Sequence, residues 1–177
     1  MLRKPNEIII NGKSLEEIIS EQILEIESLP FSCLRVDLSG LDLSCTDLRD
    51  IDLKCVDLKN TNLRGACLRC VDLKGTDLSG ACLNYADLIC ANLEEVELKG
   101  ADLSDANLSG ANLEYADLRE TDLRNTDLSY TKLNCVDLRG IDLTTVNLKG
   151  TDLTGVFLTD TDYDEFMEEI YNEEKEL

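Results

Sequence analysis

The sequence predicts an all-β solenoid, in which the chain winds through short flat sides around a narrow interior. Leucine occupies every fifth position from Leu38 to Leu158 without a break. The residue two positions before each leucine is almost always alanine, threonine or valine, and glycine often follows two positions after it. A five-residue period fits neither a straight helix nor a flat strand, but it fits a coil that turns a corner after every fifth residue.

Each five-residue unit is therefore expected to form one side of the coil. Residues two apart in an extended chain point to the same side, so the leucine and the small residue before it both face the interior. The second residue is small because four sides converge there. The residues on either side of the leucine point outward, and glycine at the last position suits a corner with an unusual backbone angle.

The unit A/T/V-D/N-L-x-x occurs 25 times over residues 36–160 and resembles the pentapeptide-repeat family. The resemblance implies a right-handed quadrilateral parallel β-helix with four units per coil and about six coils. At ~4.8 Å between stacked strands, the column is expected to be roughly 30 Å tall. Many members of the family use phenylalanine at some centres, whereas every centre here is leucine.

Residues 1–35 are predicted to form an N-terminal cap, because an open solenoid end exposes a leucine layer and unpaired strand edges. Residues 7–10 are expected to form a short strand, followed by a tight turn at Asn11-Gly12. Ser14 and Glu17 match a capping box, which predicts a helix over residues 14–28 that ends before Pro30.

Residues 161–177 are predicted to form a C-terminal helix. One face of this helix either covers the last coil or joins a second copy in a homodimer, and the sequence leaves both open. In the gyrase-protecting branch of the family, dimers form through the C-terminal end. The residues of this candidate cap or dimer face are Tyr163, Phe166, Met167, Ile170 and Tyr171.

Composition disfavours several classes of function. The net charge is −20, which disfavours direct nucleic-acid binding and favours a basic protein partner. The chain has no histidine, so Ser-His and Cys-His pairs are excluded and the commonest metal ligand is absent. We expect no catalytic residues, no cofactor and no enzyme activity. The chain has no apolar run that could cross a membrane and no signal-peptide pattern at its start, which predicts a cytoplasmic protein without membrane contact.

The eight cysteines are expected to remain reduced thiols in that compartment. Cys67 and Cys70 form a C-x-x-C pattern, but residues three apart along an extended side are ~10 Å apart, too far for one metal ion. Cys70 and Cys90 are separated by one coil and are expected to be neighbours. No metal site is predicted.

Negative charge is concentrated in the middle of the column. Residues 75–118 contain nine acidic residues and only one basic residue, Lys99. The candidate acidic binding surface, with all side chains expected to point outward, is Asp77, Glu94, Glu95, Glu97, Asp102, Asp105 and Asp117.

One side is expected to carry a ladder of carboxylates twenty residues apart: Asp37, Asp57, Asp77, Glu97, Asp117 and Asp137. Stacked like charges are expected to raise one another's pKa, with relief from cations on the same side, which are Lys59, Lys99, Arg119 and Arg139. The aspartates and asparagines before the leucines also have a simpler interpretation, because their side chains can bond the backbone of a turn.

The sequence therefore favours a non-catalytic structural or interaction module whose rigid acidic surface binds a protein partner. The alternative is a DNA mimic that binds DNA gyrase and inhibits or protects it. Cations on the ladder side weaken that alternative, since they reduce the negative field that a mimic needs.

Overall fold

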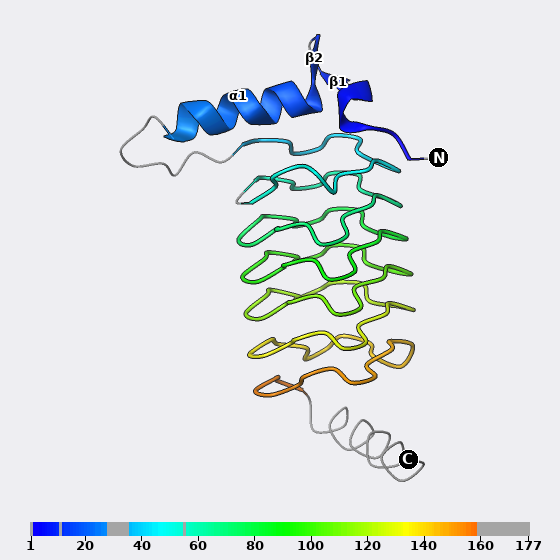
Figure 1. The fold of residues 1–177 in the computed structure, drawn as a ribbon. Helices are drawn as coiled ribbons and strands as arrows, with labels where there is room; N and C mark the ends of the chain where they lie inside the picture. The colour runs from blue at the N-terminus through cyan, green and yellow to red at the C-terminus, as the bar shows by residue number, and fades with distance from the viewer. Residues whose placement is uncertain (1, 11, 28–35, 55, 159–177) are drawn as a thin grey trace.

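The computed structural model describes residues 2–10, 12–27, 36–54 and 56–158. Within these ranges, stacked coils form a column with the N-terminal segment at one end (Figure 1). That segment contains a 3₁₀ helix at Pro5–Glu7, strands β1 (Ile9–Ile10) and β2 (Lys13–Ser14), and helix α1 (Leu15–Glu27). The predicted solenoid is confirmed.

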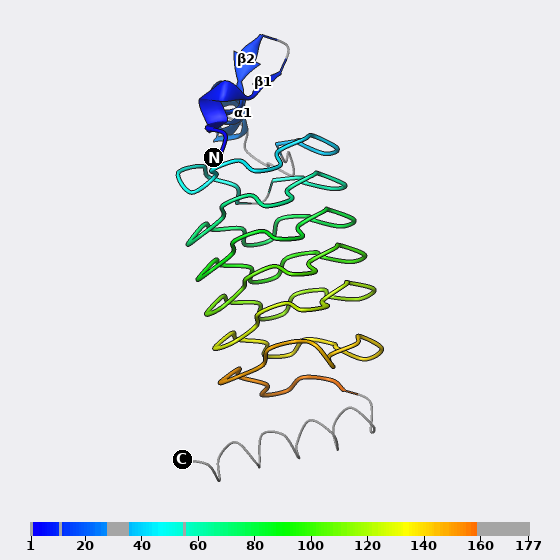
Figure 2. The same ribbon diagram turned by 90° about the vertical axis from the view of Figure 1, so that its right-hand side faces the viewer.

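One coil contains twenty residues. Isolated parallel bridges join residues twenty positions apart, such as Asp37 and Asp57. The Leu38 N–H donates to the Asp57 carbonyl at 2.8 Å, and the Gly40 N–H donates to the Lys59 carbonyl at 2.8 Å. Figure 2 shows that the corners of successive coils stack along the column. Each side is too short to be more than one bridge long, so the stack depends on repetition of the same few bonds.

Leucine side chains fill the interior. From Leu43 to Leu138, every central leucine is at most 1% exposed. Where threonine replaces the small apolar residue after the first coil, its hydroxyl bonds the leucine carbonyl of the preceding coil, as Thr61 does to Leu38 at 3.2 Å. Because a buried hydroxyl without a partner is destabilising, this bond makes threonine acceptable in the interior. The same bond is made by Thr76, Thr121, Thr126, Thr131 and Thr151.

The corner residue, two positions after the leucine, adopts a left-handed backbone conformation at every described corner except Asp50 and Thr145. Twelve non-glycine corners have φ between +53° and +62°, including Tyr130 at +57°. The leucine carbonyl accepts the N–H three residues later, as Leu63 does from Ala66 at 3.0 Å, and this turn requires a positive φ at its third residue. At Gly150 space is also limiting, because a Cβ there would lie 2.7 Å from the Tyr130 ring.

Helix α1 begins with the predicted capping box. The Ser14 N–H donates to the Glu17 carboxylate at 2.7 Å, and the Glu17 N–H donates to Ser14 Oγ at 3.2 Å. Leu15 and Ile19 are buried in the same apolar cluster as the column leucines. Figure 1 shows α1 across the end of the column. Pro30, the predicted end of this helix, lies outside the described residues.

The segment before α1 differs from the prediction. A strand was expected over residues 7–10, but Pro5–Glu7 forms a 3₁₀ helix and only Ile9–Ile10 forms a strand, paired antiparallel with Lys13–Ser14. Proline at the first helical position fits this helix start, because its fixed φ is helical and its missing N–H would have had no partner.

Residues 3 and 4 cover an edge of the first coil. Arg3 forms a parallel bridge with Thr46, and its N–H donates to the Cys45 carbonyl at 2.7 Å. The Lys4 ammonium group lies 2.9 Å from the buried Asp47 carboxylate. These contacts pair backbone groups that would otherwise form an open strand edge.

The series of backbone hydrogen bonds between coils is interrupted near the C-terminal end of the column. The Leu103 N–H donates to the Asp122 carbonyl at 2.9 Å, but one coil later the Leu123 N–H has no backbone acceptor among the described residues. The Leu118 N–H, on the adjacent side, also lacks one there. We call the interval between residues 118–125 and 137–145 the seam.

Two residues at the seam depart from the repeat. Ile141 occupies an inward position that elsewhere mostly holds alanine, threonine or valine, and we infer that its extra bulk crowds the interior on that side. Thr145 occupies the corner but is not among the residues with a positive φ, because a β-branched side chain disfavours that conformation. The Asn125 N–H consequently bonds Thr145 Oγ1 at 2.9 Å instead of a backbone carbonyl.

Leu98 is 1% exposed, so we predict that a charged side chain at this position strongly destabilises the fold. Leu98→Asp should lower the free energy of unfolding by about 4 kcal/mol or more, because it buries an unpaired carboxylate. Lys99→Ser, on the outer surface, should cost less than about 1 kcal/mol. Urea denaturation followed by circular dichroism measures both. Equal effects of the two changes would contradict the inward leucine layer.

The seam predicts that Ile141→Val will cost little. The same change ordinarily costs about 0.5–1.5 kcal/mol, but here it relieves crowding and should be neutral within about 0.5 kcal/mol. In wild type, hydrogen exchange should be faster at Leu118 and Leu123 than at Leu98 and Leu103, and Ile141→Val should reduce that difference. Equal protection of the two pairs in wild type would contradict the seam.

Candidate functional site

The aspartate or asparagine before each leucine has a structural role. Its Oδ1 accepts the N–H two residues later, as Asp37 does from Ser39 at 2.9 Å and Asn107 does from Ser109 at 3.0 Å. All twenty aspartates and asparagines at this position make that bond. The prediction that these side chains bond the turn backbone is confirmed. Much of the acidity therefore belongs to the fold itself.

Four carboxylates of the predicted ladder have lowered pKa values, so the expectation of raised values is wrong for Asp37, Asp77, Asp117 and Asp137. The Arg139 guanidinium donates to Asp137 and lowers its pKa to about 2. Arg119 likewise lowers the pKa of Asp117. At these four positions, hydrogen bonds from nearby donors outweigh the repulsion between neighbouring carboxylates. Lys99 also helps to lower the pKa of Asp117, as expected of a cation on this side, and its ammonium group lies 3.4 Å from the corner carboxylate of Glu120.

Three of the seven candidate carboxylates are occupied by contacts of the fold. Asp77 was expected to belong to an exposed surface, but it is 2% exposed, because Lys59 from the preceding coil covers it at 2.8 Å. Asp117 holds the arginine two residues later at 2.6 Å. Asp102 accepts both the N–H and the hydroxyl of Ser104, at 3.0 and 2.6 Å.

The other four candidates make no turn bond. Two further residues that the sequence reasoning missed, Glu114 and Glu120, share this property. The signal was available, because a carboxylate outside the position before leucine, or a glutamate at that position, departs from the repeat. Apart from Asp50, all such residues in the described repeats lie between positions 94 and 120. We call them the surplus carboxylates: Glu94, Glu95, Glu97, Asp105, Glu114 and Glu120.

Most surplus carboxylates lie on two neighbouring sides of the column. The bridges of Asn92 with Asn112 and of Glu97 with Asp117 define these two sides. The first side with its corner carries Glu94, Glu95 and Glu114, and the second with its corner carries Glu97 and Glu120. Asp105 lies on a third corner and accepts a bond from the Asn125 side chain at 3.1 Å.

Cations only partly neutralise this surface. Lys74 lies 2.8 Å from Glu94 and 3.4 Å from Glu95, and Lys99 contacts Glu120. The carboxylate side chains of Glu95 and Glu120 are 59% and 71% exposed, so these pairs are weak and are screened by salt. The surface therefore retains net negative charge.

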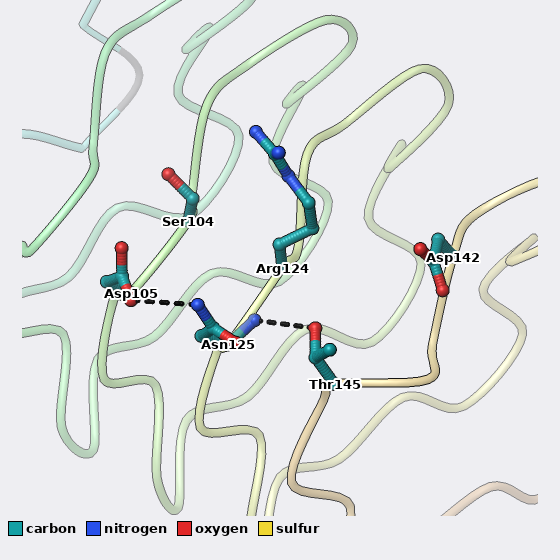
Figure 3. Close-up of a pocket in the computed structure, with 6 residues that line it drawn as sticks. All are labelled: Ser104, Asp105, Arg124, Asn125, Asp142 and Thr145. Atoms are coloured by element: carbon teal, nitrogen blue, oxygen red, sulfur yellow. Dashed lines mark hydrogen bonds between the residues drawn. The ribbon is translucent and has the colours of Figure 1, made fainter.

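A shallow hollow of about 240 Å³ lies at the seam. It is lined by Ser104, Asp105, Arg124, Asn125, Asp142 and Thr145 (Figure 3). Asn125 lies between Asp105 and Thr145 and bonds both. The guanidinium of Arg124 pairs with Asp122 at 2.6 Å. The polar groups that line the hollow therefore largely bond one another. The hollow lies where backbone hydrogen bonds between two of the described coils are missing.

The cysteines do not form a ligand cluster in the part of the chain that the structure describes. Cys67 is buried and Cys70 is exposed, although both belong to the C-x-x-C pattern. Within the described ranges, no group of three or more cysteine, aspartate or glutamate residues is arranged to hold a metal ion. Similarly, no helix there has the length and apolar character of a membrane span.

The candidate cap or dimer face lies outside the described residues. It comprises Tyr163, Phe166, Met167, Ile170 and Tyr171.

Comparison with known families identifies the repeat. The family model of pentapeptide repeats matches residues 32–69, 57–89, 86–125 and 121–160. The chain belongs to the pentapeptide-repeat family. The comparison with curated protein sequences gave no match.

Several solved structures of pentapeptide-repeat proteins are similar to the chain. One from the Arabidopsis thaliana thylakoid lumen is 28% identical, with 58% of this chain and 74% of that chain covered and a TM-score of 0.42. One from Nostoc PCC 7120 is 32% identical, with 67% and 84% covered and a TM-score of 0.32. QnrB1, described as a plasmid-mediated fluoroquinolone resistance protein, is 18% identical, with 77% and 96% covered and a TM-score of 0.34.

The lowered pKa of Asp137 predicts how this pentapeptide-repeat protein responds to acid. A carboxylate whose pKa is lower in the folded state stabilises the fold above its ordinary pKa, and that contribution is lost as the pH falls toward 2. Asp137→Asn keeps an acceptor for the turn but loses the charge. The variant should be less stable than wild type at pH 7, and the difference should shrink toward zero near pH 2. Thermal unfolding across this range measures it, and a difference that does not change with pH would contradict the assignment.

Proposed function

We propose that this pentapeptide-repeat protein is a non-catalytic interaction module that binds a basic protein through the surplus carboxylates. The observation that supports this function is the distribution of acid. The turn uses an aspartate or asparagine before the leucine, yet six carboxylates that do not fit this pattern gather between positions 94 and 120, five at other positions and Glu97 as a glutamate before its leucine. Their mutual repulsion opposes folding, so a binding role explains them better than a structural one does.

Tyr115 supports a protein partner. Its side chain is exposed and lies at the corner beside Glu114, one coil after Glu95. An exposed aromatic ring among carboxylates suits arginine and lysine side chains, which pair with the carboxylates and stack on the ring. We therefore expect an arginine- or lysine-rich surface on the partner, and binding that weakens with salt.

A non-catalytic role also fits the chemistry of the exposed side chains. The chain has no histidine, and the repeat aspartates are bound to their own turns. We place the protein in the cytoplasm. Four exposed free cysteines support that location, because a reducing compartment keeps such thiols reduced: Cys45, Cys70, Cys90 and Cys135.

We further propose a right-handed column of about six coils with a helix at each end. The twenty-residue register over residues 36–158 supports the coil number. At the N-terminal end, Leu15 and Ile19 pack into the interior, as a cap requires. The predicted C-terminal helix is the second cap of this proposal.

DNA mimicry is the alternative function for the same surface. Here the basic partner is the DNA-binding surface of DNA gyrase, and the surplus carboxylates take the place of phosphates. The two lysines at Lys74 and Lys99 count against this alternative, because both neutralise surplus carboxylates.

The binding proposal predicts the effect of removing three surplus charges. Glu94→Gln, Glu95→Gln and Glu97→Gln together should leave the circular dichroism spectrum unchanged and weaken capture of the partner about tenfold or more. The matched control removes three charges elsewhere but keeps each turn acceptor: Asp127→Asn, Asp142→Asn and Asp152→Asn. Pull-down from cytosol with quantitative mass spectrometry compares the two variants.

Equal capture of the partner by wild type and by the glutamate variant would contradict the proposed surface. Equal losses of capture in the glutamate variant and in the control would also contradict it, because they would show that only the net charge of the protein matters. Titration into a gyrase supercoiling reaction at low salt tests the alternative. Inhibition that the glutamate variant loses and the control keeps would favour the DNA mimic, and no effect at a large excess over the enzyme would exclude it.

A further inference from the structure

Four described cysteines occupy corners of the column, where their thiols are exposed: Cys45, Cys70, Cys90 and Cys135. All four have the left-handed corner conformation, with φ between +53° and +61°. Two of them, Cys70 and Cys90, are twenty residues apart and therefore occupy the same corner in consecutive coils.

The sulfur of a corner cysteine leans toward the next coil. Measured to the place that a Cβ would occupy on the next corner, the distance is 3.5 Å from Cys45 Sγ to Gly65. It is 3.4 Å from Cys90 Sγ to Gly110 and 3.6 Å from Cys135 Sγ to Gly155. Three separate corners therefore place the thiol in the same way.

At Cys70 the next corner is another cysteine. The two corners are in register, because the Cys70 N–H donates to the Ile89 carbonyl at 2.9 Å and the Cys90 N–H donates to the Ser109 carbonyl at 3.0 Å. Their φ angles are +59° and +57°. The same side-chain direction brings the Cys70 sulfur toward the Cys90 Cβ, and rotation about χ1 of Cys90 turns the two sulfurs toward each other.

The spacing suits a reversible disulfide. Stacked strands are ~4.8 Å apart, and this lies within the ~4.4–6.8 Å range of Cα separations in disulfides. The stacked Cβ atoms, in contrast, are farther apart than the ~3.8 Å mean for disulfides, so the bond requires a small approach of the corners. Strained and exposed disulfides are the ones that are easily reduced.

We propose that Cys70 and Cys90 form a dithiol switch that low-molecular-mass disulfides, such as oxidised glutathione, convert to a disulfide between consecutive coils. One protein thiolate attacks a sulfur of oxidised glutathione, which breaks its S–S bond, forms a mixed disulfide and releases one glutathione. The second thiolate attacks the protein sulfur of the mixed disulfide and releases the second glutathione. Two electrons pass from the protein thiols to oxidised glutathione, and their two protons end on the released thiols.

The other two exposed corners provide internal controls. Cys45 and Cys135 have the same exposure and backbone conformation, but each faces a glycine in the next coil. Both can form a mixed disulfide with glutathione, but neither has a second thiol at the next corner to displace it.

The test is incubation of the full chain with oxidised glutathione, followed by acid quenching and peptide mapping by mass spectrometry. We expect a Cys70–Cys90 linked peptide that is two hydrogens lighter than the reduced pair and carries no glutathione. Glutathione should accumulate on Cys45 and Cys135. In Cys70→Ser, glutathione should accumulate on Cys90, and in Cys90→Ser it should accumulate on Cys70. Dithiothreitol should reverse every product.

Three outcomes would overturn the proposal. The first is glutathione retained on Cys70 and Cys90 of wild type to the same extent as on Cys45 and Cys135. The second is a disulfide that joins Cys70 or Cys90 to a different cysteine. The third is no reaction at Cys70 and Cys90 under conditions that modify Cys45 and Cys135.

Discussion

The register of twenty residues between coils is the constraint on which the rest of the structure depends. No side of the column is long enough to be stable alone, so the column depends on backbone hydrogen bonds between consecutive coils, such as Leu38 N–H to the Asp57 carbonyl. That requirement keeps the leucines in layers and the corners in line. It also explains the N-terminal segment, where Arg3 pairs with Thr46 at the open edge of the first coil. At Ile141, which is bulky, and at Thr145, which is a β-branched corner, backbone hydrogen bonds between the described coils are missing.

The turns account for much of the acidity of a protein with net charge −20. Each repeat aspartate accepts a backbone N–H, and many also hold a nearby cation, as Asp137 holds Arg139 at 2.7 Å. Acidity is therefore an ambiguous indicator of function in this repeat, since the turn itself selects aspartate or asparagine. The surplus carboxylates do not bond a turn, so they are the acidic residues that the fold does not account for and that a function has to explain.

Sequence alone predicted the solenoid, the inward leucines, the turn role of aspartate and asparagine, and the capping box at Ser14, because each follows from spacing within a few residues. It did not predict contacts that depend on side-chain reach between coils. Asp77 is buried because Lys59 extends to it from the preceding coil, and Lys99 forms its ion pair with the corner carboxylate of Glu120. The seam was also missed, because its cause at Ile141 acts through the interior. Glu114 and Glu120 could have been found by asking which acids the repeat does not need.

The central claim is that the repeat aspartates bond their own turns, and NMR of the backbone amides tests it most directly. An amide that donates to a carboxylate changes its proton shift when that carboxylate is protonated. Lowering the pH from about 5 to about 2 should therefore shift the amide protons of Ser39, Ser44 and Ser79, which follow aspartates. Ser109, Arg64 and Lys149 follow asparagines, so their amide protons should stay nearly constant. Equal responses in the two groups would contradict the account.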